Sequence, residues 1–171
     1  MFEQTYPAVV RYARHRGLSG HDLEDLVAGT YEVAWRRFDV VPGGDQALPW
    51  LFAVALNHLR NHRRRVIRDR SLLGRLRAPE PVPAPSEPTS LSWRNIRAGL
   101  EQLSADDREL LLLIAWDGLG PAEAAAVLGV SAAAVRTRLH RARARFADAL
   151  ALEHPLEPPA ESTSWRERTH D

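Results

Sequence analysis

A proline-rich stretch near the middle of the chain most strongly constrains what the chain can fold into. Residues 78–90, APEPVPAPSEPTS, hold five prolines, no aromatic residue and no helical period. Because proline fixes φ and has no backbone N–H, such a stretch forms an extended linker rather than a helix or a central strand. We therefore predict two domains, residues 1–77 and 91–152, joined by a mobile linker. Residues 153–171 again mix prolines with polar residues, which predicts a frayed tail.

Composition narrows the class of protein. The 171 residues are 44% hydrophobic, which is enough for packed cores, and no run of about eighteen apolar residues occurs. We expect a cytoplasmic protein without membrane insertion. Cysteine is absent, so neither a disulfide nor a thiolate metal site can form. His58 and His62 lack a third ligand at a motif spacing, and we predict neither a metal nor another cofactor.

The hydrophobic pattern of both domains is helical. Apolar residues recur at helical spacing near the N-terminus, at Phe2, Tyr6, Val9 and Ala13. A second helix is predicted from Ser19, whose hydroxyl would cap it, to Phe38, and a third from about Pro49 into an arginine-rich stretch. Residues 91–103 and 106–116 supply helices of the second domain. We predict an all-α fold of two small bundles, each of about four helices, whose mutual arrangement varies.

Residues 118–150 carry the most specific pattern in the chain. Gly118 and Gly120 break the preceding helix, and residues 121–128 form a short alanine-rich helix. Gly129 supplies a turn, and Ser131 caps a longer helix that runs to about Leu150. This order predicts a helix-turn-helix motif.

The last predicted helix combines an apolar arc with a cationic face. Its apolar residues share one side of the helix: Val135, Leu139, Ala142 and Phe146. Five arginines and no acidic residue lie between positions 136 and 145, whereas a merely solvated face usually mixes both signs. Position favours Arg136 and Thr137 for base contacts, and the later arginines for phosphates. The predicted DNA-binding residues here are Ser131, Ala133, Arg136, Thr137, Arg138, His140, Arg141 and Arg143.

A second basic surface is predicted in the first domain. Eight arginines against the single acid Asp69 lie between Arg60 and Arg77. The same helix carries aromatic and amide groups: Trp50, Asn57, Asn61 and His62. Aromatic side chains on which bases can stack, next to arginines that bind phosphates, are typical of surfaces that bind melted or single-stranded DNA. The sequence is equally compatible with a Trp50 that belongs to the core and arginines that bind an acidic protein.

Three segments together resemble a known family. Residues 25–36, DLVAGTYEVAWR, are similar to the DLVQETFLRAWR segment of extracytoplasmic-function (ECF) sigma factors, and residues 49–65, PWLFAVALNHLRNHRRR, resemble the following WLYRIARNxxxDxxRR segment. Residues 100–150 resemble the fourth region of the family, including its LGVS turn and its RLHRAR helix. The segments occur in the order of the family and on either side of a linker. The resemblance implies a non-enzymatic factor that binds core RNA polymerase and directs promoter recognition, melting and transcription initiation.

The resemblance also implies roles for individual residues. The helix of residues 25–38 would dock on the clamp helices of the largest polymerase subunit, through Asp25, Glu32, Trp35 and Arg36. The loop of residues 40–48, with Asp45 and Gln46, would capture a base flipped from the minus-ten element. The next helix would hold that element through Trp50, Asn57, Arg60, Asn61, Arg63 and Arg64, and the last helix would read the minus-thirty-five element. An anti-sigma factor could clamp the two domains of the otherwise monomeric protein.

The chain departs from the family pattern at Ala28 and Gly29, which replace Gln and Glu and predict weaker binding to core polymerase. Two other functions remain compatible with the sequence. One is a free-standing helix-turn-helix regulator that finds an operator without polymerase. The other is an adaptor whose arginines bind RNA or an acidic protein. An enzyme is not predicted, because the chain has neither a GxSxG elbow nor a phosphate-binding glycine loop.

Overall fold

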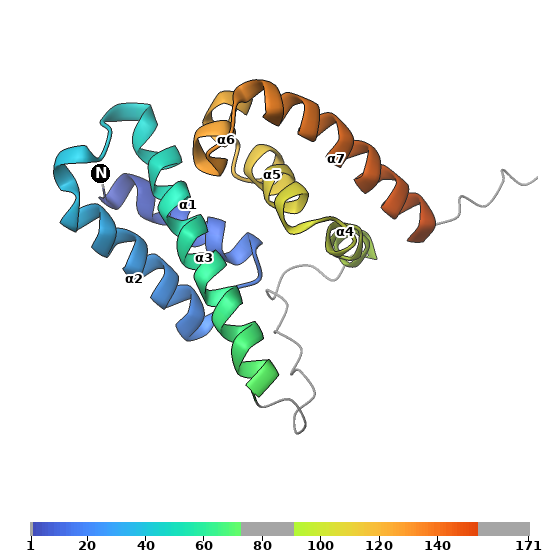
Figure 1. Cartoon of the computed structure of the whole chain (residues 1–171), viewed down its shortest axis with the longest axis horizontal. Helices are drawn as coiled ribbons and strands as arrows, with labels where there is room; N and C mark the ends of the chain where they lie inside the picture. Colours follow the sequence, from blue (N-terminus) through green and yellow to red (C-terminus); the bar gives the residue numbers. More distant parts are fainter. Residues whose placement is uncertain (1, 73–90, 154–171) are drawn as a thin grey trace, which may run out of the picture.

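A computed structural model describes residues 2–72 and 91–153, so the predicted linker and nearly all of the predicted tail lie outside the described residues. Within these ranges the chain forms seven α-helices, two 3₁₀ turns and no strand (Figure 1). The all-α prediction is therefore confirmed.

The first domain contains three α-helices: α1 (Phe2–His15), α2 (Gly20–Arg36) and α3 (Ala47–Leu72). Two 3₁₀ turns, η1 (Phe38–Val40) and η2 (Gly44–Gln46), connect α2 to α3. The sequence predicts about four helices in this domain, whereas the described residues form three α-helices. The core joins α1 to α3, where the rings of Tyr12 and Phe52 stack with centroids 4.8 Å apart.

The helix α2 differs from the prediction at its start. Ser19 occupies the N-cap position, but its hydroxyl makes no capping hydrogen bond, so the predicted cap is wrong. The next residue, Gly20, has φ of +52°, a left-handed conformation that glycine adopts without steric cost.

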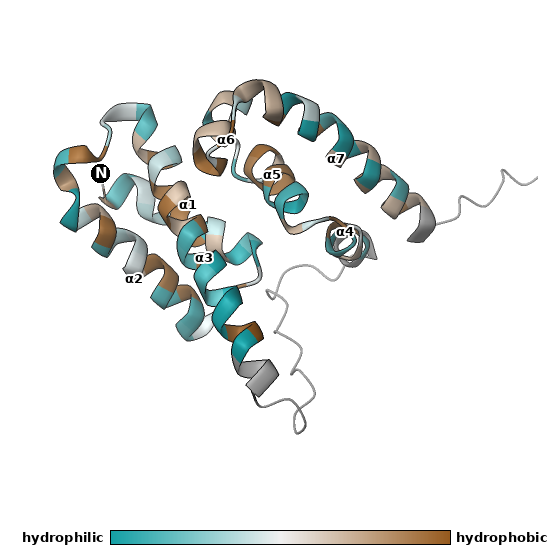
Figure 2. Ribbon diagram, viewed as in Figure 1, coloured by the Kyte–Doolittle hydropathy of each residue, from teal (hydrophilic) through white to brown (hydrophobic). Residues whose placement is uncertain are grey.

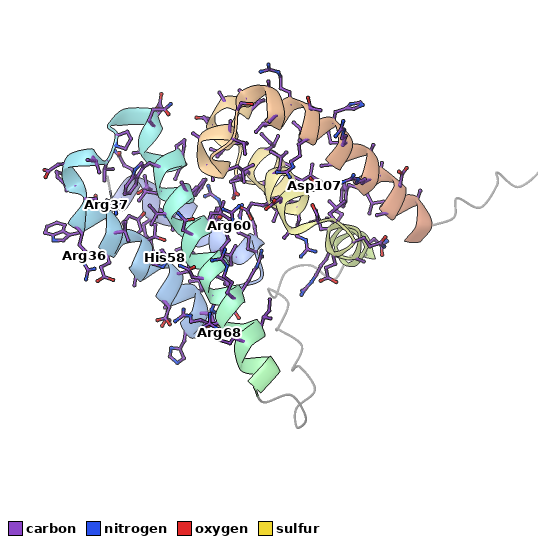
Figure 3. The ribbon with its side chains drawn as sticks, viewed as in Figure 1. Arg36, Arg37, His58, Arg60, Arg68 and Asp107 are labelled. Carbon is purple, nitrogen blue, oxygen red and sulfur yellow. The ribbon has the colours of Figure 1, made fainter. Side chains whose placement is uncertain are left out.

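Gly29, in the middle of α2, faces the neighbouring helix α3. A Cβ added at this position would lie 2.8 Å from Cε1 of His58, so a larger residue would collide with the imidazole ring. His58 belongs to α3 and is labelled in Figure 3. The glycine therefore has a packing role between two helices.

The second domain contains α4 (Leu91–Glu101), α5 (Ala105–Ala115), α6 (Pro121–Leu128) and α7 (Ala132–Glu153). The predicted helix-turn-helix is confirmed in α6 and α7. Gly129 adopts φ of +69° at the turn, and Ser131 Oγ accepts the N–H of Ala134 at 3.1 Å. The helix α7 ends at Glu153, three residues later than expected.

The two domains pack against each other, with α6 against α3 (Figure 1). Hydrophilic residues occur along α7 in the second domain and along the second half of α3 in the first domain (Figure 2). The expected variation in domain arrangement stays a prediction, and the arrangement described here includes direct ion pairs between the domains.

Candidate nucleic-acid and polymerase interfaces

The outer face of α7 presents most of the predicted recognition residues together. Val135 and Ala142 are fully buried and Leu139 is nearly so, which confirms the predicted apolar arc. Seven predicted DNA-binding residues are exposed: Ser131, Ala133, Arg136, Thr137, His140, Arg141 and Arg143. A helix whose opposite side is held in a core can enter a major groove without rearrangement.

Arg138 is engaged inside the second domain. Its Nε lies 3.3 Å from Oδ1 of Asp107, and its Nη2 lies 3.7 Å from Oδ2 of Asp106. Asp107 also pairs with Arg145, at 2.7 Å between Oδ2 and Nη1, and its side chain is only 5% exposed. Asp107 thus ties two turns of α7 to α5. Sequence reasoning missed this residue, because Asp107 follows the helix-capping Ser104 and resembles an ordinary first-turn acid.

The predicted minus-ten residues lie along α3 and at its start. Asn57, Asn61 and Arg64 are exposed, whereas Arg60 and Arg63 are partly covered by the second domain. Trp50 is half-buried and packs against the core, so part of its ring serves packing. Asp45 and Gln46 are exposed in η2, immediately before α3.

The end of α2 forms an exposed surface that combines apolar and charged groups. Trp35 is 82% exposed, and Glu32 pairs with Arg36 at 2.6 Å. Asp25 is exposed near the start of the same helix. Phe38, expected on the apolar face of α2, is instead 64% exposed, because the helix ends at Arg36 and Phe38 begins a 3₁₀ turn. The sequence predicts no function for Phe38. The neighbouring Val40, at the start of the predicted base-capturing loop, is also exposed.

A buried polar cluster joins the two domains. Arg16, in the turn directly after α1, donates to Glu109 of α5, at 2.7 Å between Nη2 and Oε1, and also lies 2.8 Å from Oδ2 of Asp117. Tyr12 donates its hydroxyl to Glu109 at 2.9 Å, and His15 Nδ1 lies 3.3 Å from Asp117. The side chains of Arg16, Glu109 and Asp117 are at most 4% exposed.

The electrostatics of this cluster favour the charged arginine and the neutral tyrosine. Burial alone lowers the pKa of Arg16, but the neighbouring Glu109 and Asp117 outweigh it and raise that pKa above its usual value. Burial raises the pKa of Tyr12 well above its usual value, against the opposing effect of Arg16. Tyr12 therefore keeps its proton and remains a donor to Glu109.

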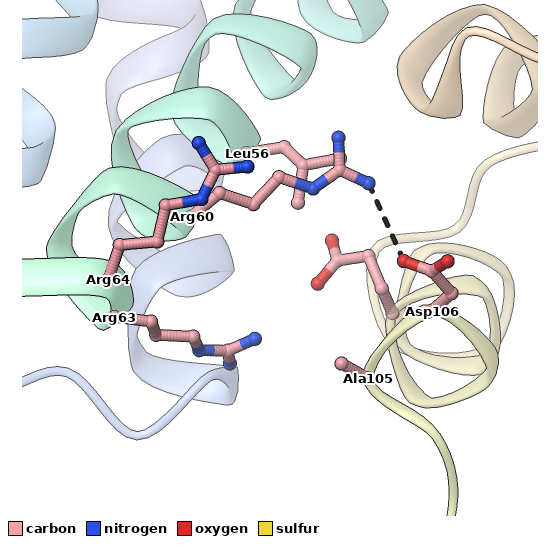
Figure 4. A pocket seen from close by; sticks show the side chains of 7 residues that line it. Leu56, Arg60, Arg63, Arg64, Ala105 and Asp106 are labelled. Atoms are coloured by element: carbon pink, nitrogen blue, oxygen red, sulfur yellow. Dashed lines mark ion pairs between the residues drawn. The ribbon is translucent and has the colours of Figure 1, made fainter. Parts of the chain in front are cut away.

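A cleft of about 180 Å³ lies beside this cluster, between α3 and α5 (Figure 4). Its walls are Leu56, Arg60, Arg63 and Arg64 on one side and Ala105, Asp106 and Glu109 on the other. Arg60 Nη2 lies 3.6 Å from Oδ1 of Asp106. Burial lowers the pKa of Arg63, partly offset by the charge of Glu109.

Two other kinds of site are absent from residues 2–72 and 91–153. No helix there has the length and hydropathy needed to cross a bilayer. In the same residues, no three His, Asp or Glu side chains gather in a way that would hold a metal ion.

The chain matches two models of one protein family. Sigma-70 region 2 matches residues 1–69, and Sigma-70 region 4 matches residues 93–146. These two ranges correspond to the two structural domains.

Characterised relatives are similar along most of their length. The RNA polymerase sigma factor CnrH of Cupriavidus metallidurans is 33% identical over 150 residues, covering 81% of this chain and 78% of CnrH. The ECF RNA polymerase sigma factor SigL of Mycobacterium tuberculosis is 30% identical, covering 83% of this chain and 82% of SigL.

Solved structures are similar as well. The sigma factor RpoE in complex with the anti-sigma factor NepR, from Bartonella quintana, superposes with a TM-score of 0.69 at 27% identity, covering 89% of this chain and 97% of RpoE. CnrH in complex with the cytosolic domain of CnrY gives a TM-score of 0.63 at 28% identity, covering 90% of this chain and 86% of CnrH. With both domains matched in order and the helix-turn-helix in place, the chain belongs to the ECF group of the sigma-70 family of RNA polymerase sigma factors.

Proposed function

We propose that this sigma factor binds core polymerase through α2, the melted minus-ten strand through α3 and the minus-thirty-five duplex through α7. It would act in the cytoplasm and would itself catalyse no reaction. The observation that carries the proposal is the exposed cationic face of α7, which lies opposite a buried apolar arc. The second cationic helix, α3, belongs to the other domain.

The face of α7 suits duplex DNA. The first residues of a recognition helix reach base edges, so Arg136 and Thr137 would contact bases, supported by Ser131, Ala133 and His140 around them. Arg141 and Arg143, on later turns, would contact phosphates. Arg138 would contribute mainly by holding α7 on α5, since it already pairs with Asp106 and Asp107.

The α3 surface suits a single strand. Asn57 and Asn61 offer amide donors and acceptors to unpaired bases, and Arg60, Arg63 and Arg64 supply positive charge for phosphates. Trp50 would offer the exposed part of its ring for stacking, and Asp45 and Gln46 would line the pocket for a flipped base. Unstacking a base costs a few kcal/mol, which these contacts must offset.

The end of α2 suits a protein partner. Exposed aromatic residues are enriched at protein interfaces, and Trp35 is the most exposed large hydrophobic residue in the described part of the chain. Asp25 and the Glu32–Arg36 pair would add charged contacts around it. Core polymerase is the partner that this surface would bind.

An anti-sigma partner is also proposed. The similar RpoE was solved with the anti-sigma factor NepR, and the similar CnrH was solved with the cytosolic domain of CnrY. A partner of that kind would bind both domains and cover the DNA and polymerase surfaces.

The test of the proposal is capture of sigma-free core polymerase by the tagged chain, compared with Trp35→Ala. We expect the wild type to retain core and the variant to lose at least about tenfold in affinity, as for the loss of one aromatic hot spot. Ile67→Ala is the matched control, because Ile67 is an exposed apolar residue on a different helix. Tight binding to an operator by a wild type with no affinity for core would instead support a free-standing regulator.

A further inference from the structure

The second half of α3 is a helix with little support from packing. Leu59 is the last buried residue of α3 among those whose side chains are described, and the side chains of residues 60–68 are all half-buried or exposed. This part of the helix projects from the bundle of the first domain (Figure 1). Helices in proteins gain most of their stability from the packing of an apolar face. The core of the first domain therefore does not explain the length of α3.

The charges of this stretch oppose the helix that carries them. Between positions 60 and 68 the chain has five arginines and no acidic residue. Arg60, Arg64 and Arg68 follow one another at four-residue intervals, and like charges at this interval destabilise an α-helix. A row of phosphates would convert the repulsion into attraction. The charge pattern therefore favours DNA as the partner of this stretch.

Ile67 is the exposed apolar residue in this cationic stretch. Its side chain is 66% exposed, so it adds little to the core. Residues 60, 63, 64 and 67 share one side of an α-helix, so Ile67 continues the row formed by Arg60, Arg63 and Arg64. A short hydrophobic stretch interrupts the hydrophilic second half of α3 at this place (Figure 2).

The chemistry of DNA restricts what Ile67 can contact. Phosphates are anionic, and the base edges in the major groove present hydrogen-bond donors and acceptors, with the C5-methyl of thymine as the apolar group among them. The major groove of a duplex also admits an α-helix. Ile67 lies about 15 Å beyond Asn57 along the helix axis, which corresponds to about four stacked nucleotides. It thus lies past the residues assigned to the melted strand, where double-stranded DNA begins.

We propose that the second half of α3 extends the minus-ten surface onto the adjoining duplex, where Ile67 contacts the methyl group of a thymine in the major groove. The exposed Arg64, one turn earlier on the same side, holds a phosphate beside it. Ile67 is then a specificity-determining residue that favours a T·A pair at one position next to the melted segment. The inference rests on the proposed minus-ten role of α3.

The experiment uses the full chain bound to core polymerase and a fork-junction DNA, which is double-stranded up to the minus-ten element and single-stranded through it. The sequence is taken from a promoter that the holoenzyme transcribes. A T·A pair is placed at each duplex position next to the junction in turn, with either thymine or deoxyuridine, which lacks only the methyl group. Affinities are measured by fluorescence anisotropy of the labelled DNA.

At one duplex position, loss of the methyl group should weaken binding by the wild type about fourfold, as for one buried methyl group. Ile67→Ala should bind the two probes equally at that position. Ile67→Leu should retain most of the difference, because leucine also offers an apolar side chain. A wild type without methyl dependence at any duplex position would overturn the proposal, and this arm does not depend on how a variant folds. Ile67→Ala with the full methyl effect would overturn it as well.

Phe38→Ala is the matched control, because Phe38 is 64% exposed in the same domain but lies outside α3. This variant should keep the methyl effect, and its loss there would show that Ile67 is not the specific cause. A methyl effect confined to the single-stranded part of the probe would contradict the duplex contact. If the holoenzyme binds the minus-ten strand without any methyl effect, the proposed role of Ile67 alone is wrong. If it binds no probe that contains the minus-ten strand, the minus-ten role of α3 is wrong and the inference falls with it.

Discussion

Asp107 shows how a single buried carboxylate sets the geometry of a recognition helix. It accepts from Arg145 at 2.7 Å and pairs with Arg138 at 3.3 Å. These two arginines lie about two helical turns apart on α7. Its backbone N–H is capped by Ser104, so its own position on α5 is fixed. The carboxylate therefore anchors α7 at two points, which fixes the direction in which Arg136 and Thr137 point.

Replacement of Asp107 by Asn should loosen this anchor. We expect a loss of about 1.5–3 kcal/mol in the free energy of unfolding of the second domain, the usual value of a hydrogen bond to a charged group. Minus-thirty-five binding should weaken as well. Asp106→Asn is the control, because Asp106 is 53% exposed and should cost little. Equal losses in the two variants, measured by denaturant unfolding, would contradict the anchoring role.

Gly29 is a second residue whose role is set by one neighbour. Alanine would favour the helix by about 1 kcal/mol, whereas an overpacked contact with a neighbouring side chain costs about 1–3 kcal/mol. Because the added Cβ would lie 2.8 Å from the His58 ring, we expect Gly29→Ala to destabilise the first domain. In a His58→Ala background the same change should become stabilising. A destabilisation that persists in that background would mean that His58 is not the cause.

At the scale of elements, the arginines of α7 look alike in the sequence but have different surroundings in the structure. Removal of an arginine that binds a DNA phosphate should lower the slope of log K against log[salt] by about 1. We expect this change for Arg141→Ala, which removes an exposed arginine, and a much smaller one for Arg138→Ala, whose guanidinium pairs with Asp107. Salt titrations of minus-thirty-five duplex binding give both slopes, and identical slopes would show that Arg138 also leaves Asp107 for DNA.

The elements differ in how far the sequence predicts them. Periodicity predicts the buried side of α7, because Val135, Leu139 and Ala142 repeat at the helical interval. It fails at the end of α2, where Phe38 continues the apolar pattern but the helix has already stopped at Arg36. It also fails for the buried polar cluster between the domains, because Arg16 and Glu109 are 93 positions apart and no local pattern relates them.

At the scale of the whole molecule, each domain carries one of the two proposed DNA surfaces, and an interface holds the domains together. The linker predicts two independent units, whereas the structure shows Tyr12 of α1 and Arg16, just after α1, in contact with Glu109 of α5. The two observations are compatible, because buried ion pairs add little net stability to an interface and a linker allows the domains to separate.

Run-off transcription with sigma-free core polymerase tests the promoter-directing role most directly. The wild type should support promoter-dependent transcripts, and Arg136→Ala/Arg141→Ala should abolish them while core capture remains intact, because both arginines are exposed and neither lies on α2. Transcripts that are unaffected by this double variant, or absent for the wild type despite tight binding to duplex DNA alone, would contradict it.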